Sequence, residues 1–378
     1  MSQDAWSDED FQAKWREEAE AIGRFNLAIF GKTGVGKSTL VNAVFGEDVA
    51  PTGVGEPVTM ENHLYLHKNG FLGLLDTRGL EIGQDTDELI DELSAYIKLM
   101  RQGPLTDQIH VAWYCVRASD RRFEDTEAEF IRRLNKLDLP VVVVMTQVPS
   151  RAGEYHGDAI ELADHIESLG LPTATKRPIM VMASSDEFTG QVQHGLNQLL
   201  DATFLAAPDG VAAALAAAQK VDLARKRREA HSAVQAAALV AAGIGAIPIP
   251  FADAGLLVPV QLGMMAKVAA IYGVKLETAT IASTALTAAL VTGGRSAVVG
   301  LLKLIPGAGT IVGGAISAGV ASSLTLATGY AWAAVCGELT LGRLRGVDGA
   351  LDTAMVQELF QKQFKVWIEN VKPSRREA

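Results

Sequence analysis

Short runs of apolar residues alternate with longer, charged helical patterns through the first half of the chain. The runs have the length of buried strands and predict strands over residues 25–30, 62–67, 71–75, 109–117, 140–146 and 178–183. The segments between them repeat apolar positions at helical spacing and predict helices over residues 38–45, 86–101, 124–137, 157–169 and 191–206. This alternation is typical of an α/β domain with a doubly wound, mainly parallel sheet.

The sequence ahead of the first strand predicts one more helix. Between Asp8 and Ile22, Phe11 and Trp15 lie four residues apart among charged residues, which places both on one helical face. We expect residues 1–22 to form an amphipathic helix that packs on the α/β domain.

The pattern changes at Ala207–Gly210, where proline, aspartate and glycine mark a domain boundary. Beyond it the chain is rich in alanine and glycine and shows no alternation of strands. A long helix is predicted from Val211 to about Ala242. We therefore predict an α/β domain over residues 23–207 and an all-α domain over residues 208–378.

The all-α part contains long uncharged stretches over residues 232–252, 278–294 and 304–337. The last exceeds the ~20 apolar residues that cross a bilayer, and its Gly309–Gly313 spacing would let helices approach closely in lipid. Prolines, and a composition dominated by Ala, Gly, Ser and Thr, favour the alternative of a buried helical bundle. Both interpretations stay open, and the length of the last stretch favours membrane association.

The chain has 378 residues, of which 48% are hydrophobic, and a formal net charge of −10. This acidic balance argues against general binding to nucleic acid, which relies on basic surface. Basic runs at residues 225–228 and 372–376 suit solvated helix faces or, in the membrane interpretation, anionic lipid. Cys115 and Cys336 form no disulfide framework, and the N-terminus lacks a signal-peptide pattern. We expect a cytoplasmic protein, with association at the inner face of a membrane as the open alternative.

Residues 31–38 read G-K-T-G-V-G-K-S and fit the P-loop pattern G-x-x-x-x-G-K-[ST]. A predicted strand precedes them and a predicted helix follows, so that backbone N–H groups and the positive helix end would face an anion. Lys37 is expected to reach the β- and γ-phosphates, and the Ser38 hydroxyl to bind Mg²⁺. The candidate nucleotide-binding residues here are Gly31, Lys32, Thr33, Gly34, Val35, Gly36, Lys37, Ser38 and Thr39.

A second motif, D-T-R-G, follows the predicted strand at 71–75. An acidic residue at a strand end holds Mg²⁺ in P-loop proteins, so Asp76 is a metal candidate. The N–H of Gly79 can contact a γ-phosphate. A threonine between the P-loop and this strand can close on Mg²⁺ when that phosphate is present; Thr59 is our candidate and Thr52 the alternative.

The P-loop, Thr59 and the D-T-R-G motif together resemble translation-factor-class GTPases of the Era-like or septin-like kind, over roughly residues 20–206. The resemblance implies that the domain binds GTP and GDP with Mg²⁺ and hydrolyses GTP. Residues from about Val234 to Val335 resemble the helical domain, of the YcjF type, that follows some bacterial Era-like GTPases. The order of N-terminal helix, GTPase domain and helical domain is also similar, more remotely, to the immunity-related GTPases.

The guanine-binding motif of such GTPases, N-K-x-D, belongs after the strand at 140–146, since ligands bind beyond the carboxyl ends of parallel strands. The sequence there is T-Q-V-P. Thr146 and Gln147 stand for Asn and Lys, but Pro149 replaces the carboxylate that would bind the guanine N1–H and amino group. This departure puts strict guanine specificity in doubt.

Two other segments bear on base recognition. N-K-L-D occurs at residues 135–138, but it lies before the strand at 140–146, and we interpret it as coincidental. After the last predicted strand, Ser184 and Ser185 stand in place of the final base-binding motif S-A-K. A backbone N–H matters most there, so the substitution is tolerable.

Leu80 follows Gly79 where many small GTPases carry a glutamine that orients water. We expect slow intrinsic hydrolysis, with Lys37, Thr59 and Gly79 serving the reaction and a partner protein or a homodimer across the nucleotide face raising the rate. Arg78 is a further candidate charge donor, although an exposed structural arginine is the simpler interpretation. The alternative function is a nucleotide-gated scaffold protein that binds GTP and hydrolyses little of it.

Overall fold

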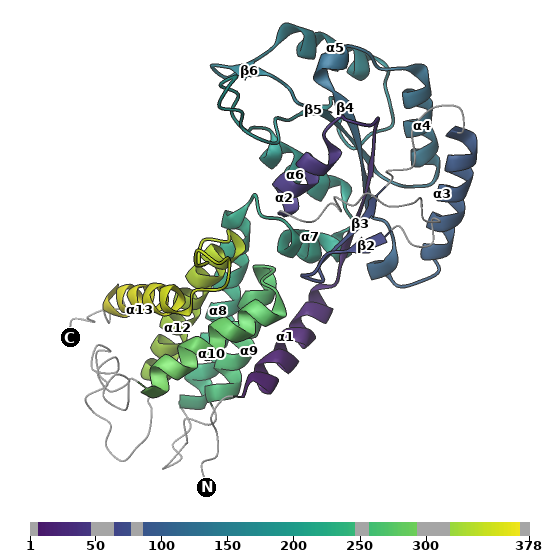
Figure 1. Ribbon diagram of the computed structural model, residues 1–378. Helices are drawn as coiled ribbons and strands as arrows, with labels where there is room; N and C mark the ends of the chain where they lie inside the picture. Colours follow the sequence, from purple (N-terminus) through teal and green to yellow (C-terminus); the bar gives the residue numbers. More distant parts are fainter. Residues whose placement is uncertain (1–6, 47–63, 77–85, 246–256, 293–317, 371–378) are drawn as a thin grey trace, which may run out of the picture. The chain divides into compact units, whose positions relative to one another are not determined.

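The computed structural model describes residues 7–46, 64–76, 86–245, 257–292 and 318–370. The chain divides into two compact units, one of residues 23–222 and the other of residues 1–22 with 223–378. Among the described residues the first unit is α/β and the second contains helices (Figure 1).

The α/β unit is built on a six-stranded sheet in the order β2-β3-β1-β4-β5-β8. Its strands are β1 (Phe25–Phe30), β2 (Leu64–Leu66), β3 (Leu72–Asp76), β4 (Val111–Arg117), β5 (Val141–Thr146) and β8 (Ile179–Met180). Strand β2 runs antiparallel to β3, and the other neighbours are parallel. The predicted doubly wound, mainly parallel sheet is therefore confirmed, and every strand of it lies within or next to a predicted apolar run.

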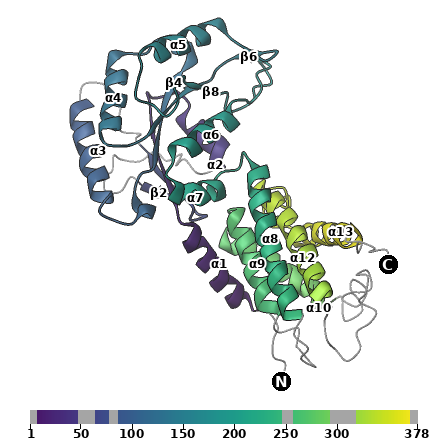
Figure 2. The same cartoon turned by 180° about the vertical axis from the view of Figure 1, so that it is seen from behind.

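Helices cover both faces of this sheet (Figures 1 and 2). One layer contains α2 (Lys37–Phe45), α6 (Leu196–Ala206) and α7 (Ala212–Ala218); the other contains α3 (Thr86–Met100), α4 (Asp125–Lys136) and α5 (Gly157–Ser168). Single turns of 3₁₀ helix, η2 (Leu105–Asp107), η3 (Ala118–Asp120) and η4 (Asp209–Val211), lie in the connections. A short hairpin of β6 (Ser150–Arg151) and β7 (Glu154–Tyr155), which the pattern did not predict, follows β5.

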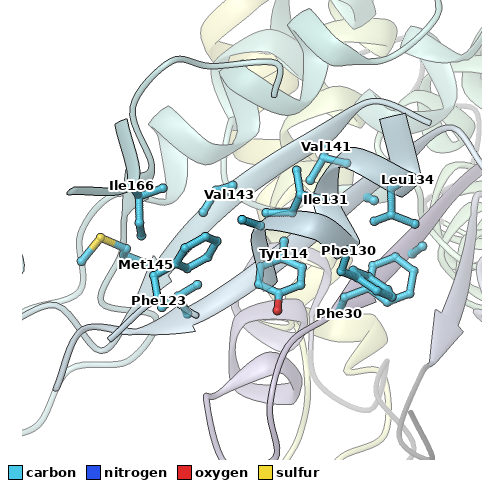
Figure 3. Close-up of a cluster of buried hydrophobic side chains, with 14 of the residues drawn as sticks. Phe30, Tyr114, Phe123, Phe130, Ile131, Leu134, Val141, Val143, Met145 and Ile166 are labelled. Carbon is cyan, nitrogen blue, oxygen red and sulfur yellow. The ribbon is translucent and has the colours of Figure 1, made fainter. Parts of the chain in front are cut away.

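Alternate side chains of β4 fill both layers of the core. Tyr114 points toward α4, where its ring centroid lies 5.9 Å from that of Phe130, in the cluster that Figure 3 shows. Trp113 stacks on Phe45 of α2 and donates its indole N–H to the Thr203 hydroxyl of α6 at 3.0 Å. Because successive side chains of a strand point to opposite faces, this one strand anchors helices of both layers.

A cluster of buried polar groups lies near the start of β1. His110 is 2% exposed; its Nδ1 accepts the Asn26 backbone N–H at 2.8 Å, and its Nε2 lies 2.8 Å from the Leu105 carbonyl. These contacts fit the neutral ring protonated at Nε2. Burial lowers the pKa of His110; the Leu105 hydrogen bond opposes this shift, and the Arg24 charge adds to it.

The α/β unit is expected to lose stability as the pH falls below about 6.5, the ordinary pKa of histidine. The unfolded chain then binds a proton at His110 that the folded chain, with its lowered pKa, does not, so the free energy of unfolding falls with the pH. The slope from one group is at most about 1.4 kcal/mol per pH unit. Urea unfolding across this range should show a flatter dependence for His110→Gln than for the exposed-site control His165→Gln; equal slopes would contradict the assignment.

The second unit is a helical assembly, as predicted. Its described helices are α1 (Asp8–Ile22), α8 (Leu223–Gly245), α9 (Leu257–Ile271), α10 (Leu276–Thr292), α12 (Ala318–Thr340) and α13 (Thr353–Asn370). Helix α12 packs against α8, α9 and α13. Its fully buried Trp332 donates the indole N–H to the Met265 carbonyl of α9 at 2.8 Å. At Gly329 of α12 there is no room for a side chain, because a Cβ would lie 2.5 Å from Val234 Cγ1 of α8.

The N-terminal helix forms where the sequence predicts it, but its expected packing partner was wrong. Helix α1 packs on α9 and α10 of the helical unit, with Phe11 and Trp15 buried. Lys267 forms an ion pair with its Glu18 at 3.1 Å. The apolar stripe of a helix shows which face is buried but not which partner covers it, and this partner lies far along the sequence.

The predicted helix from Val211 to Ala242 is interrupted. Helix α7 ends at Ala218, packs on β1 and β3, and belongs to the α/β unit. The chain therefore passes from one unit to the other between Asp222 and Leu223, and not at residue 207. The break is stabilised by Gln219, which is fully buried and whose Oε1 accepts the N–H groups of Val221 and Asp222, each at 2.7 Å.

Helix α6 begins at Leu196, later than the predicted 191. The residues before it form a bridge between Asp186 and Gln191 and another between Met182 and His194. Gly195, with φ 81°, then starts the helix. Backbone pairing therefore overrides the helical pattern in this segment.

None of the helices in the described part of the chain is both long and apolar enough to span a membrane. The end of the 304–337 stretch lies in α12, where many of its side chains are buried. Gly309, Gly313 and the basic run at 372–376 lie outside the described residues. In the run at 225–228, Lys226 is fully buried and donates to the Tyr272 carbonyl at 2.8 Å. The expectation of a wholly solvated or lipid-facing basic run is therefore wrong at this residue.

Candidate functional site

The glycine loop lies between the carboxyl end of β1 and the start of α2, as its sequence predicts. Gly31 has a φ of 132°, and a Cβ there would lie 2.3 Å from the Cys115 carbonyl oxygen of β4. This approach leaves no room for a side chain. The loop is therefore seated directly against the central strand of the sheet.

Lys37, the lysine of the P-loop pattern, folds back over its own loop. Lys37 Nζ donates to the carbonyl of Gly31 at 2.6 Å and to that of Lys32 at 3.0 Å. Behind the loop, burial raises the pKa of the Cys115 thiol to about 12, with the Lys37 charge opposing the shift. Cys115 is thus a neutral residue that packs behind the loop. The charged ammonium of Lys37 is bonded to carbonyl groups of the loop itself.

The end of β5 is fastened to the same loop. The Thr146 hydroxyl donates to the Val35 carbonyl at 2.5 Å and lies 3.3 Å from the Val116 carbonyl oxygen. Gln147, with φ 53°, directs its Nε2 to the Gly34 carbonyl at 3.4 Å. The structure thus places Thr146 and Gln147, which the sequence predicts to bind the base, in contact with the glycine loop.

Pro149 follows in the loop that enters the β6–β7 hairpin. Its carbonyl accepts the His156 N–H at 3.0 Å, and the Ser150 N–H is bound by the Gln191 side chain at 2.9 Å. Gln191 comes from the loop after β8, so the two loops that follow β5 and β8 are tied together. The hydrophobic pattern gave no signal for this hairpin or this tie.

Ser184 and Ser185 lie in the loop beyond β8, at the carboxyl edge of the sheet. The Ser185 hydroxyl accepts the Gln193 N–H at 3.0 Å, and the Gln193 side chain donates to the Ala183 carbonyl at 2.7 Å. These hydrogen bonds join residues of the same loop and stabilise its conformation. Both serines therefore occupy the region where the sequence predicts the last base-binding segment.

The N-K-L-D segment lies at the opposite end of β5. Asn135 and Lys136 belong to the end of α4, and Asp138 sits in the turn before the strand with φ 50°. The Asp138 carboxylate lies 3.6 Å from Arg101, in an exposed ion pair. This segment is separated from Thr146 by the full length of β5.

The metal candidates are only partly described. Ser38 is in the first turn of α2, and Asp76 ends β3, where its backbone pairs in register with Ile29 of β1. Thr52, Thr59, Arg78, Gly79 and Leu80 lie outside the described residues. Within the described ranges, no group of three or more His, Cys, Asp or Glu side chains could hold a metal ion.

A strand, a glycine loop that wraps a lysine, and a helix at the carboxyl edge of a parallel sheet define a P-loop nucleotide-binding domain. Residues 26–147 match the model of the family described as 50S ribosome-binding GTPase. The α/β unit therefore contains a region that is similar to the P-loop GTPases of the Era-like kind.

Curated relatives with similar sequence are GTPases. GTPase Der of Rhodopseudomonas palustris is 29% identical over 178 residues, which cover 43% of this chain and 37% of the relative. GTPase Era of Deinococcus radiodurans is 30% identical over 138 residues, which cover 36% of this chain and 41% of the relative. The chain thus spans about two fifths of the length of these relatives.

Two solved structures show weak similarity. A probable GTP-binding protein engB has a TM-score of 0.33 at 19% identity, covering 47% of this chain and 96% of that chain. A structure of an oligomerised bacterial dynamin pair also has a TM-score of 0.33, at 14% identity, covering 65% of this chain and 47% of that chain. Similarity at this level carries no weight for function.

Proposed function

We propose that this protein is a Mg²⁺-dependent GTP-binding and GTP-hydrolysing switch that acts on its helical unit. The observation that carries the proposal is the joined site: Lys37 within the glycine loop, and Thr146 of β5 bonded to the same loop. The segments that bind the phosphates and the base would then move together. Loss of the γ-phosphate would release the segments that carry Thr59 and Gly79.

The residue types at the predicted metal site support Mg²⁺ as the ion. Ser38 lies at the start of α2 and Asp76 ends β3. With Thr59 and phosphate oxygens, their side chains would supply the hard oxygen ligands that this ion takes. Bound Mg²⁺ would neutralise phosphate charge. If Ser38 and Asp76 serve in this way, removing Mg²⁺ with a chelator should weaken nucleotide binding.

Base recognition would rest on Thr146 and Gln147 on one side and on the loop of Ser184 and Ser185 on the other. The support is their position at the carboxyl ends of β5 and β8. With Pro149 in place of a carboxylate, the guanine N1–H and amino group lack their usual acceptor. GTP should therefore be preferred over ATP less sharply than in a GTPase that retains the acidic residue.

Pro149→Asp is expected to sharpen the preference for GTP over ATP by at least about tenfold, since a restored charged acceptor is worth about 1.5–3 kcal/mol. Competition titrations against a fluorescent GDP analogue measure the ratio of the two dissociation constants. The control is Asp138→Ala, which removes the acidic residue of the N-K-L-D segment and should leave both affinities within about twofold. A tenfold loss in Asp138→Ala would instead identify that segment as the base motif.

Hydrolysis is proposed to be slow in an isolated protomer, because Leu80 cannot orient water. Intrinsic rates without an orienting partner are near 10⁻⁴ to 10⁻³ s⁻¹, roughly the scale expected here. Lys37, Thr59 and Gly79 would stabilise the transferred phosphoryl group, with Arg78 as a further charge donor. Single-turnover hydrolysis at low and high protein concentration tests whether a homodimer across the nucleotide face raises the rate, and anionic vesicles test the membrane.

The second candidate is a nucleotide-gated scaffold that binds GTP and barely hydrolyses it. Leu80 and Pro149 favour it, because each replaces a side chain that turnover or selectivity uses. A rate that stays flat across a hundredfold range of protein concentration, and that vesicles do not change, would favour this scaffold or a separate activating protein.

A further inference from the structure

A second lysine of the P-loop is held by the neighbouring helix. Lys32 Nζ lies 2.8 Å from Glu124 Oε1 and 3.4 Å from Glu127 Oε2, both at the start of α4. Burial works against the charge of Lys32, yet the hydrogen bond to Glu124 and the charge of Glu127 raise its pKa. Lys32 is therefore a firmly charged cation that points to α4.

The two carboxylates differ in burial. The Glu124 side chain is 53% exposed, whereas that of Glu127 is 3% exposed. Every described contact of Glu127 matches a charged acceptor: Tyr114 donates its hydroxyl at 3.1 Å, and the Glu124 backbone N–H donates at 2.8 Å. A buried carboxylate needs such partners, because losing one leaves an uncompensated charge. Lys32 is its cationic partner.

A continuous series of contacts connects Tyr114 of the sheet with Lys37 of the P-loop. Tyr114 of β4 holds Glu127, Glu127 holds the Lys32 side chain, and the Lys32 carbonyl accepts from Lys37. We propose that Glu127 is a positioning residue for nucleotide binding, which acts through Lys32 to hold the P-loop in its phosphate-binding shape. This deepens the proposed function and rests on it.

The proposal predicts that removing Glu127 weakens nucleotide binding, whereas charge repulsion alone predicts tighter binding. Glu127 is a negative charge beside the loop that would receive phosphates, so its removal should tighten nucleotide binding if charge alone mattered. If Glu127 instead holds the loop, its removal frees the loop, and nucleotide must then restrict it at a cost in affinity. The direction of the change separates the two.

The test is the dissociation constant of a fluorescent GDP analogue with Mg²⁺, measured on the full chain. Glu127→Gln keeps the side-chain length and an acceptor for Tyr114, and is expected to raise the dissociation constant about tenfold. The matched control is Glu129→Gln, which removes the same charge from the same helix at a half-exposed position. The control is expected to change affinity by less than about twofold.

The double variant Lys32→Gln/Glu127→Gln removes both charges of the ion pair, so that neither is left without its partner. It provides a second test of the proposal if Glu127→Gln alone does not fold. It should match Glu127→Gln within about twofold, since both lack the same hold on the loop. Circular dichroism confirms that each variant is folded at the temperature used. Unchanged or tighter binding in folded Glu127→Gln, while the native chain binds GDP, would overturn this role alone; a native chain that binds no GDP would overturn the proposed function as well.

Discussion

Lys37→Ala is expected to abolish binding of nucleoside triphosphate. The ammonium lies within the glycine loop, bonded to the Gly31 and Lys32 carbonyls. In the proposed function it would supply the charge that faces the β- and γ-phosphates. Charge-assisted hydrogen bonds contribute about 1.5–3 kcal/mol each, and this lysine would make more than one. Affinity should therefore fall at least about a hundredfold, which a titration with a fluorescent GTP analogue detects directly.

The control is Lys176→Ala, which removes the same side chain at an exposed position of the same unit. It should bind as the native chain does. Thermal unfolding followed by circular dichroism separates lost binding from lost fold, because Lys37 also bonds to its own loop. Native-like affinity in folded Lys37→Ala would contradict the assignment of residues 31–38 as the phosphate site.

Gly31→Ala is expected to cause the largest loss of stability among conservative changes in the loop. Its Cβ would lie 2.3 Å from the Cys115 carbonyl oxygen, and its φ of 132° is one that alanine rarely adopts. The obstacle is backbone of a central strand, which cannot rotate aside. Overpacking and backbone strain together should cost about 3 kcal/mol, or about 6–12 °C in Tm, with weaker nucleotide binding as a consequence.

Gly34→Ala provides the comparison within the same loop. Gly34 has a φ of 79°, but a Cβ there meets nothing within 4 Å in the described structure. Only the backbone conformation is then unfavourable, at about 1–2 kcal/mol. Equal losses of Tm in the two variants would show that the contact with β4 does not limit position 31.

The sheet was predictable because its strands are uninterrupted apolar runs. Strands β1, β4 and β5 are buried on both faces, so each reads as an apolar block whatever its neighbours are. The P-loop was predictable because its chemistry is local: glycines, lysine and serine lie within one short segment between a strand and a helix. These features need no knowledge of the tertiary partner.

Packing partners were not predictable in the same way. Helix α1 shows an apolar face, but the sequence does not reveal that α9 and α10 cover it. The alanine-rich segment at 212–218 favours a continuous helix. Its packing against β1 and β3, with Gln219 buried after it, stops the helix there. Tertiary contact decided both cases over local propensity.

The site shows the same division. Thr146 and Gln147 were chosen as candidates from their position at the carboxyl end of a strand, and the structure places them beside the P-loop. Glu127 had no sequence signal, since it reads as an ordinary first-turn residue of an amphipathic helix. Its importance arises from the approach of Lys32, more than ninety residues earlier, which only the fold creates.

Calorimetric titration of the native chain with GTP, GDP and ATP, each with Mg²⁺, tests the central claim most directly. Thr146 and Gln147 lie at the P-loop while Pro149 supplies no carboxylate. GTP and GDP should therefore bind, and ATP should bind more weakly than GTP, by a smaller margin than Pro149→Asp shows. Tighter binding of ATP than of GTP, or no heat with any of the three nucleotides, would contradict a guanine-nucleotide switch built on this loop.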